Sequence, residues 1–315
     1  MSKGYWAPFL HAHLPFIRHP EFEYFLEEHW FFEALNECYL PLIRRFFRLA
    51  EDGVPFRLTM SLTPTLASML SDPLLMSRFR KYMLRTFELA EKEIHRTEGD
   101  LDLNRLARYY LDRLNVMLKF YDDVLGSDVL AGFARLAEKG HIQIVTSGAT
   151  HGLLPLLAYH SPSVEAQVET AVKTHIRLLG REPDGIMLPE CAYYEGLDEV
   201  LSRHNLKYFI MESHGILYSR PRCQNGVFAP IYTANGVAAF GRDQESSKQV
   251  WSTKEGYPGD ACYRDFYRDV GFDLDMDYVG PYVSPDGIRT FTGIKYHRIT
   301  GDTEQKELYN PCLLY

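Results

Sequence analysis

Cysteine is scarce in this sequence of 315 residues, and its distribution argues against two kinds of site. The five cysteines form an odd-numbered set with no Cys-x-x-Cys pair: Cys38, Cys191, Cys223, Cys262 and Cys312. Closely paired spacings mark disulfide frameworks and thiolate zinc sites, so neither is indicated. Scattered single thiols are typical of a reducing compartment, and the sequence therefore predicts a cytoplasmic protein.

Long hydrophobic runs are also lacking. No apolar stretch approaches the roughly 18 residues of a membrane helix. The first residues hold one early lysine and a short apolar stretch broken by Pro8, without the apolar core and small-residue cleavage site of an export signal. We therefore expect neither a membrane partner nor export.

An excess of positive charge is absent as well. The formal net charge is −8, and 46% apolar with 24% charged residues is an ordinary balance for a folded chain. Nucleic acid is not expected as a partner, because its recognition needs a basic surface. The length suffices for two domains or for one large α/β barrel. Aromatic residues reach 14%, which fits either a large core or a cleft that stacks sugar rings.

Strand patterns alternate with helical patterns along most of the chain, which predicts a parallel sheet, closed as a barrel or open and doubly wound. The expected strands are 4–10, 56–62, 141–147, 185–188, 208–211, 237–241 and 293–300. The expected helices between them are 31–50, with a kink at Pro41, and 129–139, 163–179 and 195–204. The stretch 72–126 breaks this rhythm and is interpreted as a helical insertion, which leaves 1–71 and 127–315 for the sheet domain.

Polar and ionisable residues follow five of the seven expected strands. They are His11 with His13, Thr150 with His151, Glu190, Glu212 with His214, and Arg242 with Asp243. Catalytic groups gather at the carboxyl ends of barrel strands, whereas an open sheet binds ligands only around its switch point, so this pattern favours the barrel. Neither G-x-G-x-x-G nor G-x-x-x-x-G-K-[ST] occurs, so dinucleotide and P-loop functions are not indicated.

Glu190 is the leading candidate for chemistry. It directly follows a hydrophobic strand, behind a proline and ahead of Tyr193 and Tyr194, where a carboxylate can be partly desolvated and act as a nucleophile or an acid. A carboxylate that stabilises a helix N-terminus explains the same position, and the spacing alone leaves both interpretations open.

The histidines admit three interpretations. His11, His13 and His151 could ligate a catalytic zinc, because sites of three histidines exist. They could also bind a sugar, because neutral imidazoles donate and accept hydrogen bonds to hydroxyls. The third interpretation is structural, with the imidazoles satisfying backbone groups at strand ends. His214, at the end of the fifth strand, is added as a candidate for substrate binding.

The stretch 241–260 combines glycines, charged residues and aromatics. It contains Arg242, Trp251 and Gly259, which makes it a candidate rim for a saccharide. An ordinary solvated surface loop has the same composition, so this alternative stays open.

Three of these motifs together resemble glycoside hydrolase family 57: HAHLPF at 11–16, SGATHGLLP at 147–155 and LPECAYY at 188–194. Further segments resemble the family's α-1,4-glucan branching enzymes: EEHWFFEALNECYLPL from residue 27, RDQESSKQVWS, GYPGD and GIKYHRITG. The resemblance extends over essentially the whole chain.

The resemblance implies an incomplete, TIM-like (β/α)7 barrel with an inserted helical segment, and a retaining mechanism on α-1,4-glucan such as amylose, glycogen or maltooligosaccharides. By motif, Glu190 matches the nucleophile, while His11, His13 and His151 match residues that line the donor subsite. Arg242 and Gly259 match glucan-binding positions, and Trp251 is a possible stacking surface. No metal and no other cofactor is implied.

The sequence departs from the family in one respect. The family's general acid is an aspartate in a fourth motif beyond GIKYHRITG, and nothing after Thr300 matches that motif; Asp302 is only a superficial echo and is not assigned. We therefore expect the N-terminal part of a longer enzyme, or a natural short form. Loss of leaving-group protonation, typically worth about 10² to 10⁴ in rate, predicts little or no branching activity for these residues alone.

Three other functions stay open: a 4-α-glucanotransferase or α-amylase of the same family, a non-catalytic glucan-binding fragment, and a metal-dependent barrel hydrolase that uses the three histidines. Linkage analysis of the products, the effect of Glu190→Gln on binding and turnover, and the zinc content of the protein separate these alternatives.

Overall fold

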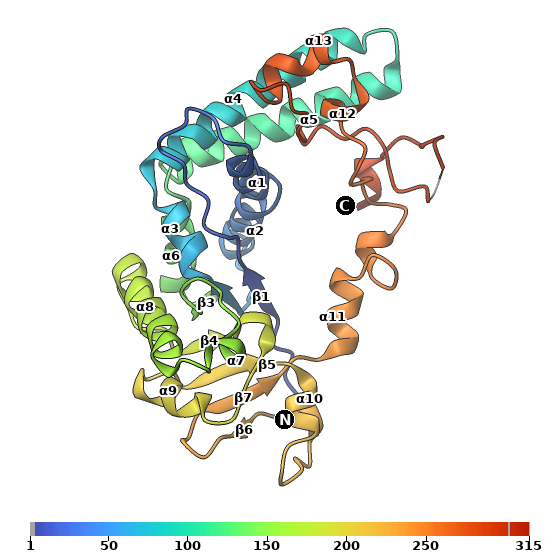
Figure 1. Ribbon diagram of the computed structural model, residues 1–315. Helices are drawn as coiled ribbons and strands as arrows, with labels where there is room; N and C mark the ends of the chain where they lie inside the picture. The colour runs from blue at the N-terminus through green and yellow to red at the C-terminus, as the bar shows by residue number, and fades with distance from the viewer. Residues whose placement is uncertain (1–3, 302, 315) are drawn as a thin grey trace. The chain divides into compact units, whose positions relative to one another are not determined.

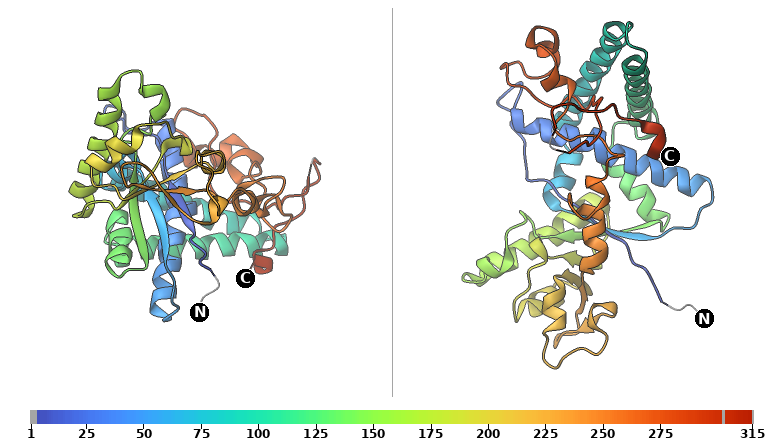
Figure 2. Two further views of the ribbon diagram at one scale, coloured as in Figure 1. Left: turned by 90° about the horizontal axis from the view of Figure 1, so that it is seen from below. Right: turned by 90° about the vertical axis from the view of Figure 1, so that its right-hand side faces the viewer.

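The computed structural model describes residues 4–301 and 303–314, which form two compact units (Figures 1 and 2). The sheet unit comprises 4–16, 46–72 and 130–247, and the helical unit comprises 17–45, 73–129 and the described residues from 248 onward. In the part of the chain that the structure describes, no helix is long and apolar enough to cross a membrane.

The sheet unit is built on seven strands in the order β1-β2-β3-β4-β5-β7-β6. The strands are β1 (Phe9–Ala12), β2 (Leu58–Leu62), β3 (Ile142–Ser147), β4 (Gly185–Met187), β5 (Tyr208–Met211), β6 (Ile231–Tyr232) and β7 (Ala238–Gly241). Every pairing is parallel except that of β6 with β7. The predicted α/β fold, an incomplete (β/α)7 barrel, is confirmed.

Helices cover the sheet and close its core. They are α3 (Pro64–Leu70), α6 (Val129–Glu138), α7 (Leu154–Leu157), α8 (Ser161–Leu179), α9 (Leu197–Arg203) and α10 (Ser213–Leu217). One core cluster joins Val168 of α8 and Leu201 of α9 to Ile186 of β4 and Phe209 of β5, all of them buried. Strands that are covered in this way read as apolar runs, which is why β4 was visible in the sequence although it is three residues long.

The helical unit contains two long antiparallel helices, α4 (Pro73–Arg96) and α5 (Leu101–Lys119), which lie side by side in both figures. Asp100 begins α5 as its N-cap, and its carboxylate accepts hydrogen bonds from the backbone N–H groups of Asp102 and Leu103. The other helices are α1 (Leu26–Ala34), α2 (Leu40–Glu51), which continues into the sheet unit, α11 (Gln244–Trp251), which begins in it, α12 (Val270–Asp273) and α13 (Met276–Val279).

The helical unit is larger than the insertion expected at 72–126, because 17–45 and the residues from 248 onward group with α4 and α5. One buried cluster contains Leu89 and Leu106 of those helices together with Val270, Ile294 and Tyr296 from the later part of the chain. The prediction of a strand at 293–300 is also wrong, because this stretch packs with α4 and α5 in the helical unit. Its alternating apolar residues pack against helices, and the stretch takes part only in isolated bridges.

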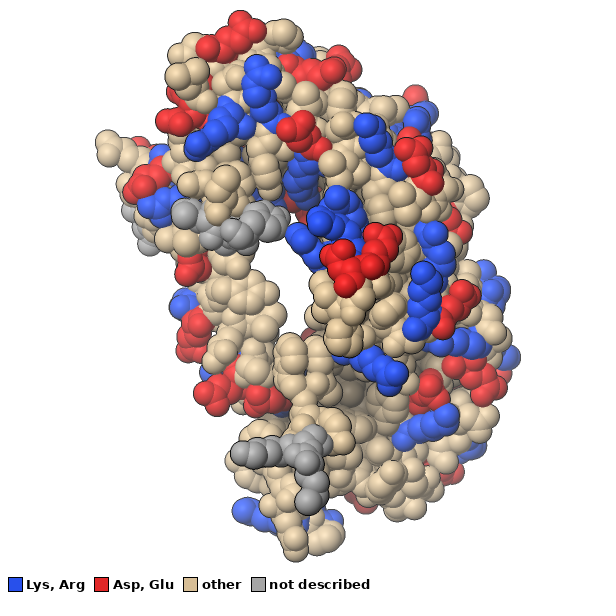
Figure 3. All heavy atoms as spheres, turned by 180° about the vertical axis from the view of Figure 1, so that it is seen from behind, with Lys and Arg blue, Asp and Glu red and all other residues tan. Residues whose placement is uncertain are grey.

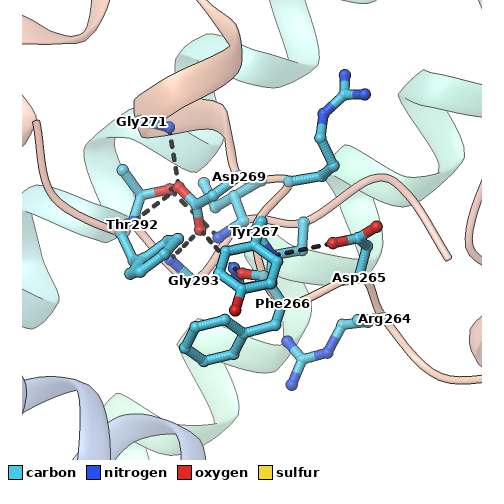
Figure 4. A network of polar contacts seen from close by, with 12 residues as sticks. Arg264, Asp265, Phe266, Tyr267, Asp269, Gly271, Thr292 and Gly293 are labelled. Carbon is cyan, nitrogen blue, oxygen red and sulfur yellow. Dashed lines mark hydrogen bonds and ion pairs between the residues drawn. The ribbon is translucent and has the colours of Figure 1, made fainter. Parts of the chain in front are cut away.

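An aspartate fixes this later segment in place (Figure 4). Asp269 is fully buried, and its carboxylate accepts hydrogen bonds from the backbone N–H groups of Gly271, Thr292 and Gly293 and from the Thr292 hydroxyl, at 2.7–2.9 Å. Lys295 Nζ lies 3.5 Å from the same carboxylate. The Gly293 N–H, the first backbone donor of the expected strand, is therefore taken by a side chain and not by a neighbouring strand.

Two differences from the expectation lie at prolines. The first strand begins at Phe9 rather than at Gly4, beyond Pro8, which has no backbone N–H to give a neighbouring strand. The expected kink at Pro41 is a π-helical turn, Leu35–Tyr39, directly before α2, because proline cannot supply the helical hydrogen bond.

On the face shown in Figure 3, basic and acidic side chains are interspersed.

Candidate active site

A strained turn after β4 carries Glu190. The chain leaves the strand at Leu188 and forms a 3₁₀ turn, Pro189–Cys191, in which Glu190 and Cys191 adopt left-handed φ angles of 55° and 54°. The Cys191 side chain is buried, whereas the Glu190 side chain is 77% exposed. The turn therefore anchors its own base and presents the carboxylate outward.

Neighbouring strands hold this turn. The Glu212 N–H, directly after β5, donates to the carbonyl of Cys191 at 2.9 Å. Tyr193 stacks on Phe209 of β5 with 5.2 Å between ring centroids, and its hydroxyl donates to the Asp198 carboxylate at 3.2 Å.

Three imidazoles form a cluster, and one of them, His151, lies beside Glu190. His11 is in β1, His13 follows β1, and His151 follows β3 with a left-handed φ of 59°. Their rings are stacked, with centroids 5.8 Å apart for His11 and His13, 5.2 Å for His11 and His151, and 3.9 Å for His13 and His151. His151 Nε2 lies 3.8 Å from Glu190 Oε1. Strand register brings together residues that are far apart in the sequence, because β1 pairs with β2 and β2 with β3.

A hydroxyl contacts the Nδ1 atom of each imidazole. The partners are Ser61 for His11 at 2.6 Å, Thr63 for His13 at 3.2 Å and Ser147 for His151 at 3.2 Å. None of the three hydroxyl residues was singled out from the sequence, although their places on β2, directly after β2 and at the end of β3 were a possible signal.

Desolvation by the surrounding protein keeps these rings uncharged, although His11 is itself exposed and His13 and His151 are half-buried. Burial and the neighbouring imidazoles lower the pKa of His11 and of His13 to about 4. Burial also lowers the pKa of His151, against the opposing influence of the Glu190 carboxylate. At pH 7 the site therefore presents neutral imidazoles, which are hydrogen-bonding groups for a neutral ligand.

The stacking gives the zinc alternative no support. Imidazoles that share a metal ion direct their in-plane lone pairs at one point about 2.0–2.1 Å away, whereas the lone pairs of stacked rings run side by side. Within the described residues, no group of three or more His, Cys, Asp or Glu side chains is arranged to hold a metal ion.

An ion pair lies next along the same edge of the sheet. Arg242, directly after β7, donates from Nη2 to Glu212 Oε2 at 2.7 Å, and Gln244 Nε2 donates to Glu212 Oε1 at 2.9 Å. Burial raises the pKa of Glu212, but these donors and the Ser213 N–H outweigh it, so the pKa lies below its ordinary value. Glu212 is thus held as an anion, which suits a partner for Arg242 and does not suit a proton donor.

The remaining candidates are not all brought to this edge. His214 lies in the first turn of α10 with its side chain exposed. Trp251, 63% exposed, and Gly259 belong to the helical unit, so their role in glucan binding stays a prediction. A Cβ on Gly259 would come within 2.1 Å of the Thr253 carbonyl oxygen, which gives this glycine a packing role of its own. Asp302 lies outside the described residues.

The fold and this arrangement of groups define a class, namely incomplete α/β barrels with a carboxylate at the carboxyl edge of the sheet. The chain belongs to glycosyl hydrolase family 57, whose sequence profile matches residues 8–307. This confirms the family expected from the motifs, a family of α-glucan-active enzymes.

Known relatives cover the chain well. A 1,4-alpha-glucan branching enzyme from Thermococcus kodakarensis is 32% identical over 298 residues, which are 84% of this chain and 42% of that enzyme. The solved structure of the alpha-amylase AmyC from Thermotoga maritima is 44% identical, with a TM-score of 0.92, and the match covers 97% of this chain and 59% of that one.

A branching enzyme of the same family from Pyrococcus horikoshii is 31% identical, with a TM-score of 0.83, and the match covers 99% of this chain and 56% of that one. The chain therefore spans about half the length of the relatives that it matches.

Proposed function

We propose that this chain supplies the nucleophile, Glu190, of a retaining enzyme that acts on α-1,4-glucan. The observation that carries the proposal is the exposed Glu190 carboxylate 3.8 Å from the His151 imidazole at the carboxyl edge of the barrel. In this mechanism Glu190 attacks the anomeric carbon of a glucose unit and forms a glycosyl-enzyme. In retaining enzymes a second carboxyl group about 5 to 5.5 Å from the nucleophile protonates the leaving oxygen, and no residue of this chain is proposed for that role.

The surrounding groups suit a neutral polyol. His11, His13 and His151 offer hydrogen bonds to sugar hydroxyls without a charge that a sugar cannot match. Arg242 is oriented by Glu212 and contributes a further donor at the same edge. Glu212 itself is not proposed as the general acid, because its donors lower its pKa.

For the finer activity we propose 1,4-α-glucan branching, in which the 6-hydroxyl of another glucan chain takes the glycosyl group from Glu190. Support comes from the branching enzymes among the relatives, which match most of this chain. The substrates would be amylose, glycogen and maltooligosaccharides. The proposed branching reaction also requires that the site exclude water, which would otherwise hydrolyse the intermediate.

Hydrolysis is the second candidate. It is favoured by the 44% identity to an α-amylase, which is higher than the identity to the branching enzymes named above. Both activities share the glycosyl-enzyme and differ in the acceptor. The fraction of α-1,6 linkages in products from amylose distinguishes them, and transfer that forms only α-1,4 linkages would indicate a 4-α-glucanotransferase.

The decisive experiment uses α-maltosyl fluoride, because fluoride departs without a proton from a general acid and the assay therefore tests the nucleophile alone. We expect fluoride release and a maltosyl adduct on the peptide that contains Glu190. Glu190→Gln should reduce release more than about 10³-fold, since the covalent route is lost. Glu195→Gln is the matched control, because Glu195 is an exposed glutamate on the same loop.

Two results would contradict the proposal. One is fluoride release at the parent rate by Glu190→Gln. The other is a parent chain that binds maltooligosaccharides, never releases fluoride and keeps its affinity in Glu190→Gln, which would indicate a glucan-binding fragment.

A further inference from the structure

A chain of hydroxyls determines the ring proton of His13. Thr65 donates its single hydroxyl hydrogen to the Leu14 carbonyl at 2.8 Å. In the 3.1 Å contact between the Thr65 and Thr63 hydroxyls, Thr63 must therefore be the donor. Its hydrogen is then used, and the Thr63 oxygen can only accept, both from the Leu66 N–H and from His13 Nδ1. His13 thus carries its proton on Nδ1.

The same counting applies to His151 through a different hydroxyl. Ser147 donates its single hydrogen to the Met187 carbonyl of the adjacent strand β4 at 2.8 Å. The contact of 3.2 Å between Ser147 Oγ and His151 Nδ1 therefore requires a donor on the imidazole. His151 also carries its proton on Nδ1, and its Nε2 atom, which faces Glu190, has a free lone pair.

Burial limits the hydrogen-bond partners of these hydroxyls to protein groups, which makes the assignment of the ring protons definite. Thr63 and Ser147 are 0% exposed and Thr65 is 8% exposed, so bulk water has little access to offer these hydroxyls other acceptors. Each hydroxyl must then use the fixed protein groups around it. Ser61 does not determine His11 in this way, because its contact to His11 Nδ1 leaves open which of the two atoms donates.

We propose that the Thr63–Thr65 pair and Ser147 are positioning residues that fix the protons of His13 and His151 on Nδ1, so that both Nε2 atoms act as hydrogen-bond acceptors, that of His151 beside Glu190. The assignment of the protons follows from the hydroxyl geometry alone. The ligand class, a sugar that donates hydroxyl hydrogens to these acceptors, rests on the proposed function.

The consequence is a subsite of acceptors. His151 Nε2 and the Glu190 carboxylate face each other across 3.8 Å, and neither has a hydrogen to share when the imidazole is neutral. A sugar hydroxyl that donates toward these atoms relieves this repulsion, whereas an ether, a carbonyl or a fluorine adds another acceptor. The geometry therefore selects ligands by the hydrogens that they offer.

The first test measures the tautomers without any ligand. In protein labelled with ¹⁵N-histidine, long-range ¹H–¹⁵N correlations at pH 7 distinguish a protonated Nδ1 from a protonated Nε2. The two rings are assigned by the signals that disappear in His13→Gln and His151→Gln. We expect Nδ1–H as the major tautomer of both. A major Nε2–H form in either ring would overturn the proposal, whatever the protein does to glucan.

Variants of the hydroxyl chain test the cause. Thr65→Val leaves the Thr63 hydrogen free to turn toward His13, so the Nε2–H form of His13 should increase while His151 does not change. Ser147→Ala should release His151 in the same way, and Thr65→Ser should restore the parent spectrum. Ser61→Ala is the control and should leave His13 and His151 unchanged. Tautomers that do not respond to Thr65→Val and Ser147→Ala would refute the role of these hydroxyls.

The second test probes the ligand. A set of maltotrioses is used in which one hydroxyl of the terminal glucose is replaced by hydrogen or by fluorine. Calorimetry compares the affinity of each with that of maltotriose. Where a hydroxyl donates to the acceptor subsite, replacement by hydrogen should weaken binding by about two- to tenfold for one lost hydrogen bond, and replacement by fluorine should weaken it at least as much. Fluorine that restores affinity would show a donor in the protein and would contradict the acceptor subsite. If maltotriose does not bind although the tautomers are as expected, only the proposed function fails.

Discussion

Replacing Asp269 by asparagine tests whether one carboxylate holds the later part of the helical unit. Asp269 Oδ1 accepts from the N–H groups of Gly271 and Thr292 and from the Thr292 hydroxyl, while Oδ2 accepts from the Gly293 N–H and lies near Lys295 Nζ. Asparagine has only one oxygen. Whichever way its amide is turned, an NH₂ group faces donors that are buried with it.

The expected cost is large. Breaking a buried charged network by altering one partner costs about 3 to 5 kcal/mol, because the remaining donors stay buried without an acceptor. Urea unfolding followed by circular dichroism measures this loss. Hydrogen exchange of the Gly271, Thr292 and Gly293 amides locates it, and these amides should lose most of their protection. Asp277→Asn, at an exposed position in α13, is the control and should change stability by less than about 0.5 kcal/mol.

A loss below about 1 kcal/mol with unchanged exchange of these amides would refute this reasoning, because ordinary surface substitutions fall in that range. It would mean that the apolar contacts of Ile294 and Tyr296 with α4 and α5 hold the segment without the carboxylate.

Two further predictions concern the sheet unit. Glu212→Gln removes the anion that orients Arg242, so maltooligosaccharide binding measured by calorimetry should weaken about tenfold while the urea midpoint changes little; unchanged affinity would contradict the positioning of Arg242. Because the pKa of His13 falls from 6.5 to about 4 on folding, the unfolded chain binds more protons between these values, so stability should fall as pH is lowered from 6.5 to 4. His13→Gln should flatten part of that slope in urea titrations, and an unchanged slope would argue against the lowered pKa.

Much of the sheet unit could be predicted because its strands follow local rules. β2 alternates apolar with polar residues, and β4 is a short apolar run that ends at a proline. Once parallel strands are expected, their carboxyl ends lie at one edge, so Glu190 and the histidines could be placed together without a structure. The short distance between the His13 and His151 rings, whose centroids are 3.9 Å apart, agrees with that placement.

The errors arose where tertiary contacts override local pattern. The stretch 293–300 alternates like a strand, but its buried residues face helices, and Asp269 takes its first backbone donor, the Gly293 N–H. The strand β6 follows Pro230 and has only two residues, and a strand of that length is too short to show a period of alternation. The hydroxyls of Thr63, Thr65 and Ser147 were missed because their distant partners, His13, the Leu14 carbonyl and the Met187 carbonyl, are brought to them by strand pairing.

The backbone at this edge is strained where the proposed chemistry lies. Glu190, Cys191 and His151 all adopt left-handed φ angles, which cost of order 1–3 kcal/mol each for residues with a Cβ. The buried Cys191 side chain and the hydrogen bond from the Glu212 N–H to the Cys191 carbonyl hold the turn in this conformation. Ser147 links β4 to His151 in the same way. The carboxylate and the imidazole are therefore held by the rigid sheet rather than by their own preferences, and this is the condition under which fixed acceptors can discriminate between ligands without reorganising.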